Sequence, residues 1–199
     1  MNGPVKLHLG CGKRYLPGYT HIDFADFPHI DYRHDIKNLD MFEDNTVDEI
    51  YACHCLEHFA RKDVKDVLTE WHRVLRKPAL NNATPPPPPN ECSRGGGLIR
   101  LAVPDFEAVA RHYDEHHNME IINSFMVGGQ KNEYDFHYVV FDFDSLKKAL
   151  EDVGFADVSR YDWRDFLPEG FDDYSRSYLP HMDFDNGKLM SLNVTAIKK

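Results

Sequence analysis

The chain has no stretch that approaches the run of about 20 consecutive apolar residues a membrane span requires. Its first seven residues also lack the basic, then apolar, then small-residue order that is typical of a signal peptide. These two absences argue against a membrane protein and against an exported one. We therefore expect a cytoplasmic protein that does not act on a membrane.

Cysteine is scarce and irregularly placed, with four residues at Cys11, Cys53, Cys55 and Cys92. Small secreted scaffolds that depend on disulfides contain more cysteines at more regular spacings. We therefore interpret these four side chains as reduced thiols, which agrees with a cytoplasmic location.

Basic residues are outnumbered, because 23 Lys and Arg stand against 33 Asp and Glu and leave a formal net charge of −10. A polyanion would be repelled by such a surface rather than attracted to it. Nucleic acid is therefore not expected as a partner. The charge gives no indication of an oligomeric state.

The composition and the apolar pattern of the chain predict a folded α/β protein. The 199 residues, 42% apolar and 13% aromatic, suit one domain spanning residues 1–199. Short apolar runs that predict strands alternate with segments of helical period, an order typical of a sheet flanked by helices on both faces. The predicted strands are residues 5–9, 19–23, 46–53, 97–103, 155–159 and 192–197, and the predicted helices are residues 64–75, 106–113 and 146–153.

One segment, residues 79–96, has no periodicity and contains five consecutive prolines. Proline-rich chain of this kind is extended and solvated, which predicts a loop insert rather than an element of the sheet. A docking motif for an SH3-like partner is the alternative interpretation, and a tolerated insertion is the one we favour.

Small and acidic residues follow the first strands. Gly10 and Gly12 follow the first predicted strand, Asp23 closes the second, and Asp35 lies further on. In open α/β sheets, ligands bind outside the carboxyl ends of the strands. Glycines allow a close backbone approach to the ligand, and the two acids suit a ribose and an exocyclic amine. Since Tyr15 replaces the third glycine of a dinucleotide fingerprint, we predict an adenosine ligand without a pyrophosphate.

Several motifs carry a resemblance to a known family. They are the segments Leu7-His-Leu-Gly-Cys-Gly12, Thr20-His-Ile-Asp23, Asp35-Ile36, Val47-Asp-Glu-Ile-Tyr51, Leu56-Glu-His58, Trp71-His-Arg-Val-Leu-Arg76 with Pro78, and Val103-Pro-Asp105. Together they resemble class I S-adenosylmethionine-dependent methyltransferases, and in particular the small type 11-like subgroup associated with saccharide or other small-molecule modification.

The resemblance implies a fold and a set of cofactor contacts. The implied fold is a Rossmann-like three-layer sandwich with a seven-stranded, mostly parallel sheet in the order 3-2-1-4-5-7-6, the last strand being antiparallel. The implied cofactor is S-adenosylmethionine, with the glycine loop at the methionine, Asp23 at the ribose, and Asp35 and Ile36 at the adenine. The expected cofactor-binding residues are Leu9, Gly10, Cys11, Gly12, Asp23, Asp35, Ile36 and Cys53.

Three residues are candidates for catalysis: His137, Asp105 and His58. His137 lies in a polar, glycine-bearing stretch, where an imidazole is able to take the proton from an attacking hydroxyl. A surface histidine is the alternative. Asp105 follows a proline and precedes a predicted helix, so it is either a helix cap, a contact near the transferred methyl group, or both.

The segment His54-Cys-Leu-Glu-His58 fits the H-x-x-E-H pattern of inverted zinc peptidases. That chemistry requires a helix, because two ligands four residues apart share a face only there. This segment follows a β-rich run, so we predict no metal site, although a zinc hydrolase built on His54, Glu57 and His58 remains an alternative.

The predicted function is methyl transfer from S-adenosylmethionine to an oxygen or nitrogen nucleophile of a small molecule, such as a saccharide. Such a transfer asks mainly for proximity and alignment. A second alternative is a catalytically silent binding module that uses the proline-rich insert. Residues 161–184, which are rich in aromatics and acids, are either a binding lid or a wrap over the sheet.

Overall fold

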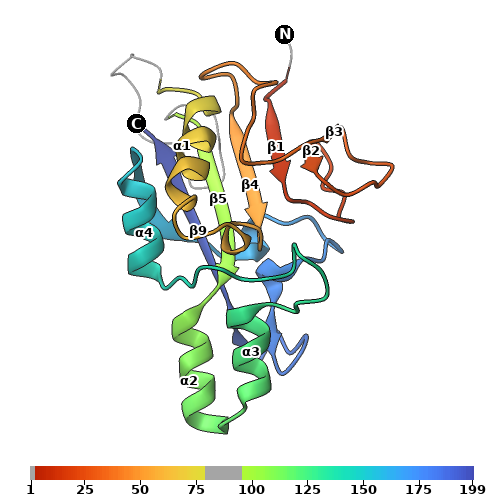
Figure 1. The fold of residues 1–199 in the computed structure, drawn as a ribbon, viewed down its shortest axis with the longest axis vertical. Coiled ribbons are helices and arrows are strands. Elements are labelled where there is room, and N and C mark those ends of the chain that lie inside the picture. The colour runs from red at the N-terminus through yellow and green to blue at the C-terminus, as the bar shows by residue number, and fades with distance from the viewer. Residues whose placement is uncertain (1–2, 79–95) are drawn as a thin grey trace.

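A seven-stranded sheet forms the centre of the computed structural model, which describes residues 3–78 and 96–199 (Figure 1). The strands of this sheet are β1 (Lys6–Leu9), β2 (Thr20–Asp23), β3 (Tyr32–Arg33), β4 (Glu49–Cys53), β5 (Leu98–Pro104), β6 (Phe155–Arg160) and β9 (Ser191–Lys198).

The strand order is β3-β2-β1-β4-β5-β9-β6, and β9 runs antiparallel to both of its neighbours. This confirms the predicted order and the antiparallel last strand. β3 has only two residues and no apolar alternation, so the sequence pattern did not predict it. Because β1, β2, β4 and β5 are parallel, their carboxyl ends meet at one edge of the sheet.

Four α-helices are present among the described residues: α1 (Val64–Val74), α2 (Phe106–His116), α3 (Met119–Val127) and α4 (Phe143–Glu151). Three of them lie where the apolar spacing predicts a helix, whereas α3 was not predicted. In Figure 1, α2 and α3 form a hairpin beyond the carboxyl edge, and α1 and α4 cover one face of the sheet.

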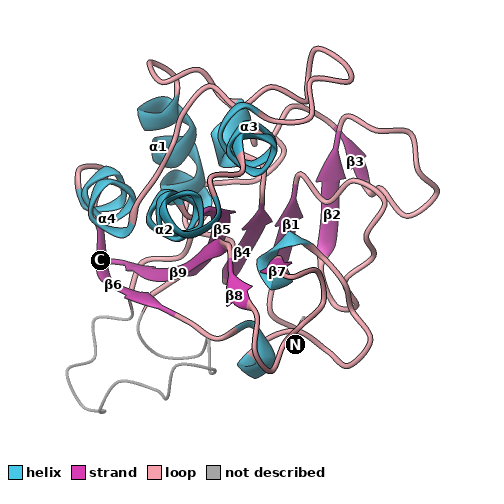
Figure 2. Ribbon diagram, turned by 90° about the horizontal axis from the view of Figure 1, so that it is seen from below, coloured by secondary structure: helices cyan, strands magenta, loops and turns pink. Residues whose placement is uncertain are grey.

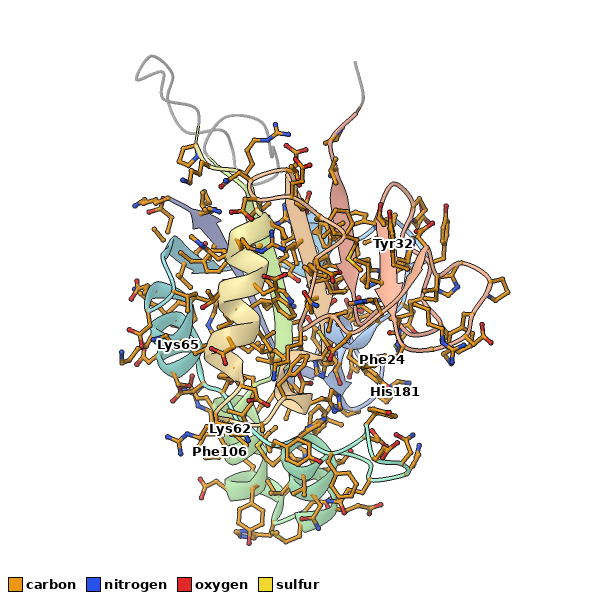
Figure 3. The ribbon with its side chains drawn as sticks, turned by 45° about the horizontal axis from the view of Figure 1, so that its top comes forward. Phe24, Tyr32, Lys62, Lys65, Phe106 and His181 are labelled. Carbon is orange, nitrogen blue, oxygen red and sulfur yellow. The ribbon has the colours of Figure 1, made fainter. Side chains whose placement is uncertain are left out.

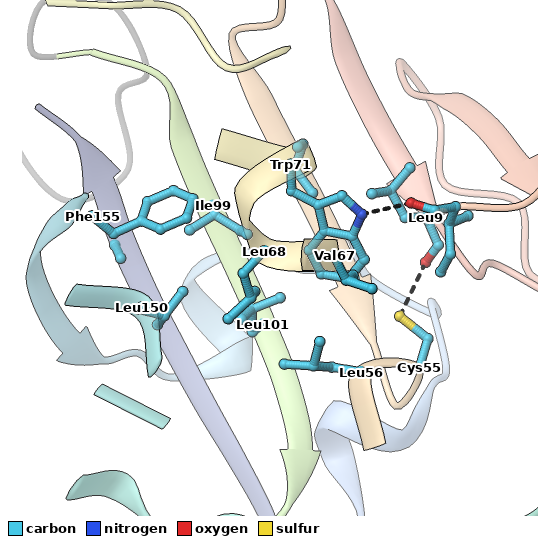
Figure 4. Packing of buried hydrophobic residues seen from close by; sticks show 14 of the residues in the cluster. Leu9, Cys55, Leu56, Val67, Leu68, Trp71, Ile99, Leu101, Leu150 and Phe155 are labelled. Atoms are coloured by element: carbon cyan, nitrogen blue, oxygen red, sulfur yellow. Dashed lines mark hydrogen bonds between the residues drawn. The ribbon is translucent and has the colours of Figure 1, made fainter. Parts of the chain in front are cut away.

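The face of the sheet beneath α1 and α4 carries the apolar core. Trp71, Val67 and Leu68 of α1 pack on Ile99 and Leu101 of β5 (Figure 4). The buried indole of Trp71 donates a hydrogen bond of 2.7 Å to the carbonyl of Ile36, so it also has a polar partner. Its apolar area and its hydrogen bond together fix α1 against the chain that leaves β3.

The opposite face differs from the expected layer of helices, since irregular chain covers it (Figure 2). Here Tyr51 of β4 packs on Phe166 and Leu167, and Arg100 forms a buried ion pair of 2.9 Å with Glu49. A face with buried polar groups needs partners that a simple apolar helix stripe does not supply. The segment after β6 supplies aromatic rings instead, so the wrap interpretation of residues 161–184 agrees with the structure.

That covering segment has little regular structure. Its short elements are the 3₁₀ helices η2 (Trp163–Asp165) and η3 (Tyr174–Arg176) and the hairpin of β7 (Tyr178–Leu179) with β8 (Lys188–Leu189).

The proline-rich segment, predicted at residues 79–96, lies almost wholly outside the described residues, but the chain on either side of it is defined. The Gly97 amide donates a hydrogen bond of 2.7 Å to the Arg76 carbonyl, at the amino end of β5. The two ends of the segment therefore leave from the edge of the sheet opposite the carboxyl ends of the parallel strands. Within the described part of the chain, no helix is both long and apolar enough to cross a membrane.

Candidate functional site

A cavity of about 480 Å³ opens at the carboxyl edge of the sheet. This volume lies within the range of about 300–1,000 Å³ that is usual for small-molecule sites. Residues from the ends of β1, β2 and β4 meet there with residues from the loop that follows α3. The lining residues are Gly10, Asp23, Phe24, Ala25, His34, Ile36, His54, Cys55, His58, Phe59, Asn132, Glu133 and Tyr134.

The glycine loop after β1 needs both of its glycines. Gly10 and Gly12 have φ values of +61° and +54°, in the left-handed region that other residues rarely adopt. A Cβ atom on Gly10 would lie 2.7 Å from the Cβ of Cys55, whereas a Cβ on Gly12 would meet nothing within 4 Å. Gly10 therefore allows two chain segments to pack, and Gly12 leaves open space beside its backbone.

Asp23, at the end of β2, fixes this loop. Its carboxylate accepts hydrogen bonds of 2.7 Å from the Gly12 amide and 2.8 Å from the Ala25 amide, one on each oxygen. A carboxylate oxygen has two acceptor positions, so each one keeps a position for a ligand hydroxyl. Burial, together with the charge of Asp23, raises the pKa of the Cys11 thiol to about 12, which keeps this thiol neutral.

The other residues expected at the cofactor divide into two groups. Ile36 lines the cavity, as expected for an adenine contact. Leu9, Cys11, Gly12, Asp35 and Cys53 do not. Asp35 accepts a hydrogen bond from the Lys37 amide, and Leu9 is fully buried in the core.

Cys53 packs against the Tyr51 cluster on the other face, and Cys55, two residues later, lines the cavity instead. Cys53 ends β4 and shares the face of Tyr51, two residues earlier. Cys55 lies beyond the strand, after the chain turns at His54, which has a φ of +50°.

The 3₁₀ helix η1 (Leu56–His58) places a group of charged side chains beside the cavity. His58 lines the cavity, and its Nδ1 atom lies 3.0 Å from the Phe136 carbonyl. Glu57 is buried, and its Oε1 atom is 3.3 Å from Nδ1 of His54. Burial opposes the ionisation of Glu57, but the adjacent imidazoles of His54 and His58 outweigh it and lower the pKa of this carboxyl group.

His137 lies behind His58, with 4.8 Å between the two ring centroids. Its backbone amide donates to the carbonyl of Val127, and its Nδ1 atom lies 2.8 Å from the carbonyl of Phe125. Helices leave their last carbonyls without internal partners, so His137 caps the C-terminus of α3. Burial lowers the pKa of His137, which favours the neutral imidazole.

Asp105, expected as a catalytic candidate, does not line this cavity. One of its carboxylate oxygens accepts from the amides of Glu107 and Ala108 at the start of α2, and the other is 3.1 Å from Arg160. Both oxygens are therefore used by a helix cap and an ion pair. Of its two expected roles, the structure shows the cap.

Three aromatic residues of the cavity, Phe24, Phe59 and Tyr134, were not predicted from the sequence. Phe24 lies beside the loop that follows α3 (Figure 3), and its ring centroid is 5.8 Å from that of Tyr134. Phe24 directly follows Asp23, so proximity to a predicted site residue was the available signal. Tyr134 gave no signal, because it reaches the cavity only through the position of α3.

A larger cavity of about 650 Å³ lies between α1 and α4, lined in part by Arg61, Lys65 and Phe141. None of the glycine-loop or strand-end residues described above contributes to it. Size alone therefore does not identify the site, and the smaller cavity carries the chemistry.

The comparisons with known proteins agree with this geometry. Residues 20–79 match the type 11 family model described as a methyltransferase domain, a segment that includes Asp23, Ile36 and η1. Residues 20–79 are thus similar to a methyltransferase domain. No curated protein matches the sequence.

Solved structures similar to this chain support its fold. An S-adenosylmethionine-dependent methyltransferase from Archaeoglobus fulgidus has a TM-score of 0.54 at 14% identity, covering 98% of this chain and 87% of the other. A Haloferax volcanii methyltransferase solved with the Trm112 activator has a TM-score of 0.51 at 15% identity, covering 98% of this chain and 83% of the other. The CurJ carbon methyltransferase has a TM-score of 0.55 at 14% identity, covering 98% of this chain and 48% of the other.

Gly12 and Asp23 fit an S-adenosylmethionine ligand. A Cβ on Gly12 would meet open space, and the carboxylate of Asp23, which accepts a hydrogen bond from the Gly12 amide, keeps acceptor positions for a ligand hydroxyl. The structure does not support the zinc hydrolase alternative. His54 lies outside the three-residue η1, so His54 and His58 do not share the helix that a zinc peptidase motif requires.

Proposed function

We propose that this protein transfers a methyl group to an oxygen or nitrogen nucleophile of a small molecule, and a saccharide hydroxyl suits the site well. The observation that carries this proposal is the position of His58 on the wall of the same cavity as Asp23 and Ile36. A cofactor site and a candidate proton acceptor thus open into one space.

S-adenosylmethionine, when bound, supplies an activated methyl group. Gly10, Gly12 and Asp23 are proposed to hold its methionine and ribose parts, and Ile36 with His34 to contact the adenine. Asp35, which does not line the cavity, would act only through the loop it shapes with the Lys37 amide.

His58 is proposed to receive the proton of the acceptor. Its Nδ1 atom faces a carbonyl oxygen, which only accepts, so Nδ1 carries the hydrogen and Nε2 keeps its lone pair. That lone pair is able to accept a hydrogen bond from an O–H or N–H group and orient it. His137, whose ring stands against that of His58, is proposed to hold this imidazole in place.

The size of the cavity and the polar side chains within its lining favour a compact polar acceptor. Asn132, Glu133 and His34 offer side chains that hydrogen-bond hydroxyl groups. A carbon acceptor, as in the CurJ protein, has no O–H or N–H group for His58 to orient. The net charge of −10 disfavours a nucleic acid acceptor.

Calorimetry with S-adenosylmethionine tests the cofactor half of the proposal. Asp23→Ala should weaken binding by about 1.5–3 kcal/mol, because a ribose loses a charged acceptor. Asp26→Ala is the matched control, since Asp26 is a nearby acid whose side chain is 87% exposed. Absence of binding by the parent protein, or equal affinity in both variants, would contradict the proposal.

A screen of sugars, amines and phenols with a labelled methyl donor tests the acceptor half. Incorporation into an oxygen or nitrogen position is the expected result. Labelling confined to carbon would disprove the proposed acceptor class while leaving the cofactor site intact.

A further inference from the structure

Three side chains able to bind a metal converge behind the wall of the cavity. Glu57, His58 and His137 each offer a ligand atom, and these atoms lie within 4.8 Å of one another. Imidazole and carboxylate are ligands that divalent transition metals such as Zn²⁺ accept in proteins. We propose that these three residues bind one divalent transition-metal ion of this kind.

The two imidazoles have the orientation that metal ligands usually have. Nδ1 of His58 is 3.0 Å from the carbonyl of Phe136, and Nδ1 of His137 is 2.8 Å from the carbonyl of Phe125. Because these carbonyls only accept, each neutral ring carries its hydrogen on Nδ1 and keeps the Nε2 lone pair free. Metal-binding histidines almost always donate their other N–H in this way, to a carbonyl, a carboxylate or water.

The carboxylate lacks the partners that a buried charge requires. Glu57 is 1% exposed, and its Oε2 atom has no hydrogen-bond partner in the described part of the chain. Its Oε1 atom is 3.3 Å from Nδ1 of His54, whose Nε2 atom is 3.0 Å from the hydroxyl of Ser191. A buried carboxylate is normally paired or bound to a metal. A cation at this position would supply the missing partner, and His54 would hold the second oxygen.

The geometry needs only a small adjustment. In a tetrahedral zinc site with bonds of about 2.1 Å, neighbouring ligand atoms are about 3.4 Å apart. The widest separation in the cluster is 4.8 Å, so the side chains must close by about 1.4 Å at most. Because His58 also lines the cavity, the fourth position of the metal would open toward the acceptor.

The site has a consequence for the reaction, which rests on the proposed function. A metal ion on His58 takes the lone pair that the proposed transfer uses to accept a proton. Zn²⁺ and the acceptor therefore compete for the same nitrogen, and Zn²⁺ should inhibit methyl transfer.

A second pair of histidines would also bind added zinc, so it must be removed from the protein that is titrated. His112 and His116 of α2 have ring centroids 4.4 Å apart and lie on an exposed helix, so they also offer two ligands to added zinc. Cys92 supplies a further thiol. The test uses untagged full-length protein carrying His112→Ala, His116→Ala and Cys92→Ser as the background for every variant.

Calorimetric titration with ZnCl₂, without cofactor, is the decisive experiment. We expect one ion per chain in the background protein. Glu57→Gln and His137→Gln should each lower the affinity at least about tenfold. The glutamine at position 137 can still donate to the Phe125 carbonyl and so preserve the cap of α3. His34→Ala is the matched control, because it removes an imidazole from the same cavity but not from the cluster, and its affinity should be unchanged.

No zinc binding in the background protein, or equal affinity in all three variants, would overturn the metal site, provided that circular dichroism shows each variant folded. The failure of the proposed function is a separate outcome. If zinc binds as expected but does not inhibit transfer, the site stands and the role of His58 as proton acceptor falls. If methyl transfer proceeds but zinc does not bind, the metal site is wrong and the proposed role of His58 stands.

Discussion

The cavity has two walls that are built in different ways. The strand wall consists of Gly10, residues 23–25, His34 and Ile36, which follow the ends of β1, β2 and β3. The loop wall consists of His58 from η1 and residues 132–134 from the loop after α3. The strand wall is shaped by backbone turns and one carboxylate, and the loop wall is shaped by side chains anchored to neighbouring carbonyls.

The loop wall is held by contacts between segments that are distant in the sequence. The Tyr138 amide donates a hydrogen bond of 2.8 Å to the Glu57 carbonyl, and Nδ1 of His58 lies 3.0 Å from the Phe136 carbonyl. The positions of the loop-wall side chains therefore depend on these contacts between η1 and the segment that follows α3. Under the proposed function, cofactor binding depends on the strand wall and proton transfer on the loop wall, so we expect the two to be altered separately.

The largest effect should come from His58→Ala in the loop wall. Turnover should fall about 10²- to 10⁴-fold, the usual contribution of a general base. Cofactor affinity, measured by calorimetry, should stay within about threefold. A variant that loses cofactor binding but keeps its turnover per bound complex would show that the two walls are not separable.

A second effect, on folding stability, distinguishes Gly10 of the strand wall from Gly12. Gly10→Ala should cost about 2–4 kcal/mol of folding free energy, because it adds both left-handed strain and a contact of 2.7 Å with Cys55. Gly12→Ala adds strain alone and should cost about 1 kcal/mol. Chemical denaturation without cofactor measures both, and equal losses would contradict the role assigned to Cys55.

Tyr134→Ala tests the aromatic contact between Phe24 of the strand wall and Tyr134 of the loop wall. The Phe24–Tyr134 pair has a centroid distance of 5.8 Å, and such pairs contribute about 0.5–1.5 kcal/mol. If the pair covers bound cofactor, the affinity for S-adenosylmethionine should fall about two- to tenfold. Tyr138→Ala is the control, since Tyr138 is an exposed tyrosine of the same loop whose side chain does not line this cavity. Equal losses in both variants would argue for a general effect on the loop.

The smallest effect should follow from deletion of residues 79–94, which lie outside the described residues. The chain on either side is joined by the Gly97–Arg76 hydrogen bond of 2.7 Å, so a short turn can replace the segment. Loop closure depends weakly on length, and stability should change by about 1 kcal/mol or less. Thermal unfolding and turnover check this, and a deletion that keeps cofactor binding but loses transfer would place the segment in the acceptor site.

The strand wall could be predicted from the sequence, and the loop wall could not. Gly10 and Asp23 follow recognisable apolar runs, and parallel strands bring their carboxyl ends together without further information. Ile36 was expected only from the family resemblance, because β3 before it has no apolar pattern. Cys53 was expected at the cofactor, but its side chain packs on the face away from the cavity.

The loop wall depends on tertiary contacts that the sequence pattern does not encode. The helix α3 has nine residues, and the sequence pattern did not separate it from the polar, glycine-bearing stretch of residues 128–137 that follows it. Without α3 there was no way to bring His137 beside His58. His137 was expected to act on the acceptor, but it lies behind His58, outside the cavity lining, and its cap on α3 was not predicted.

The position of β9 affects how the chain reaches its native state. β9 pairs with β5 and β6 on its two sides, and its residue Val194 lies opposite Leu101, 93 positions earlier in the chain. Until residues 191–198 have been synthesised, β5 has an unpaired edge and β6 has no neighbour in the sheet. Long-range pairing of this kind slows folding and leaves a strand edge open to other chains. We therefore expect nascent chains that stop before residue 191 to aggregate rather than to bind cofactor.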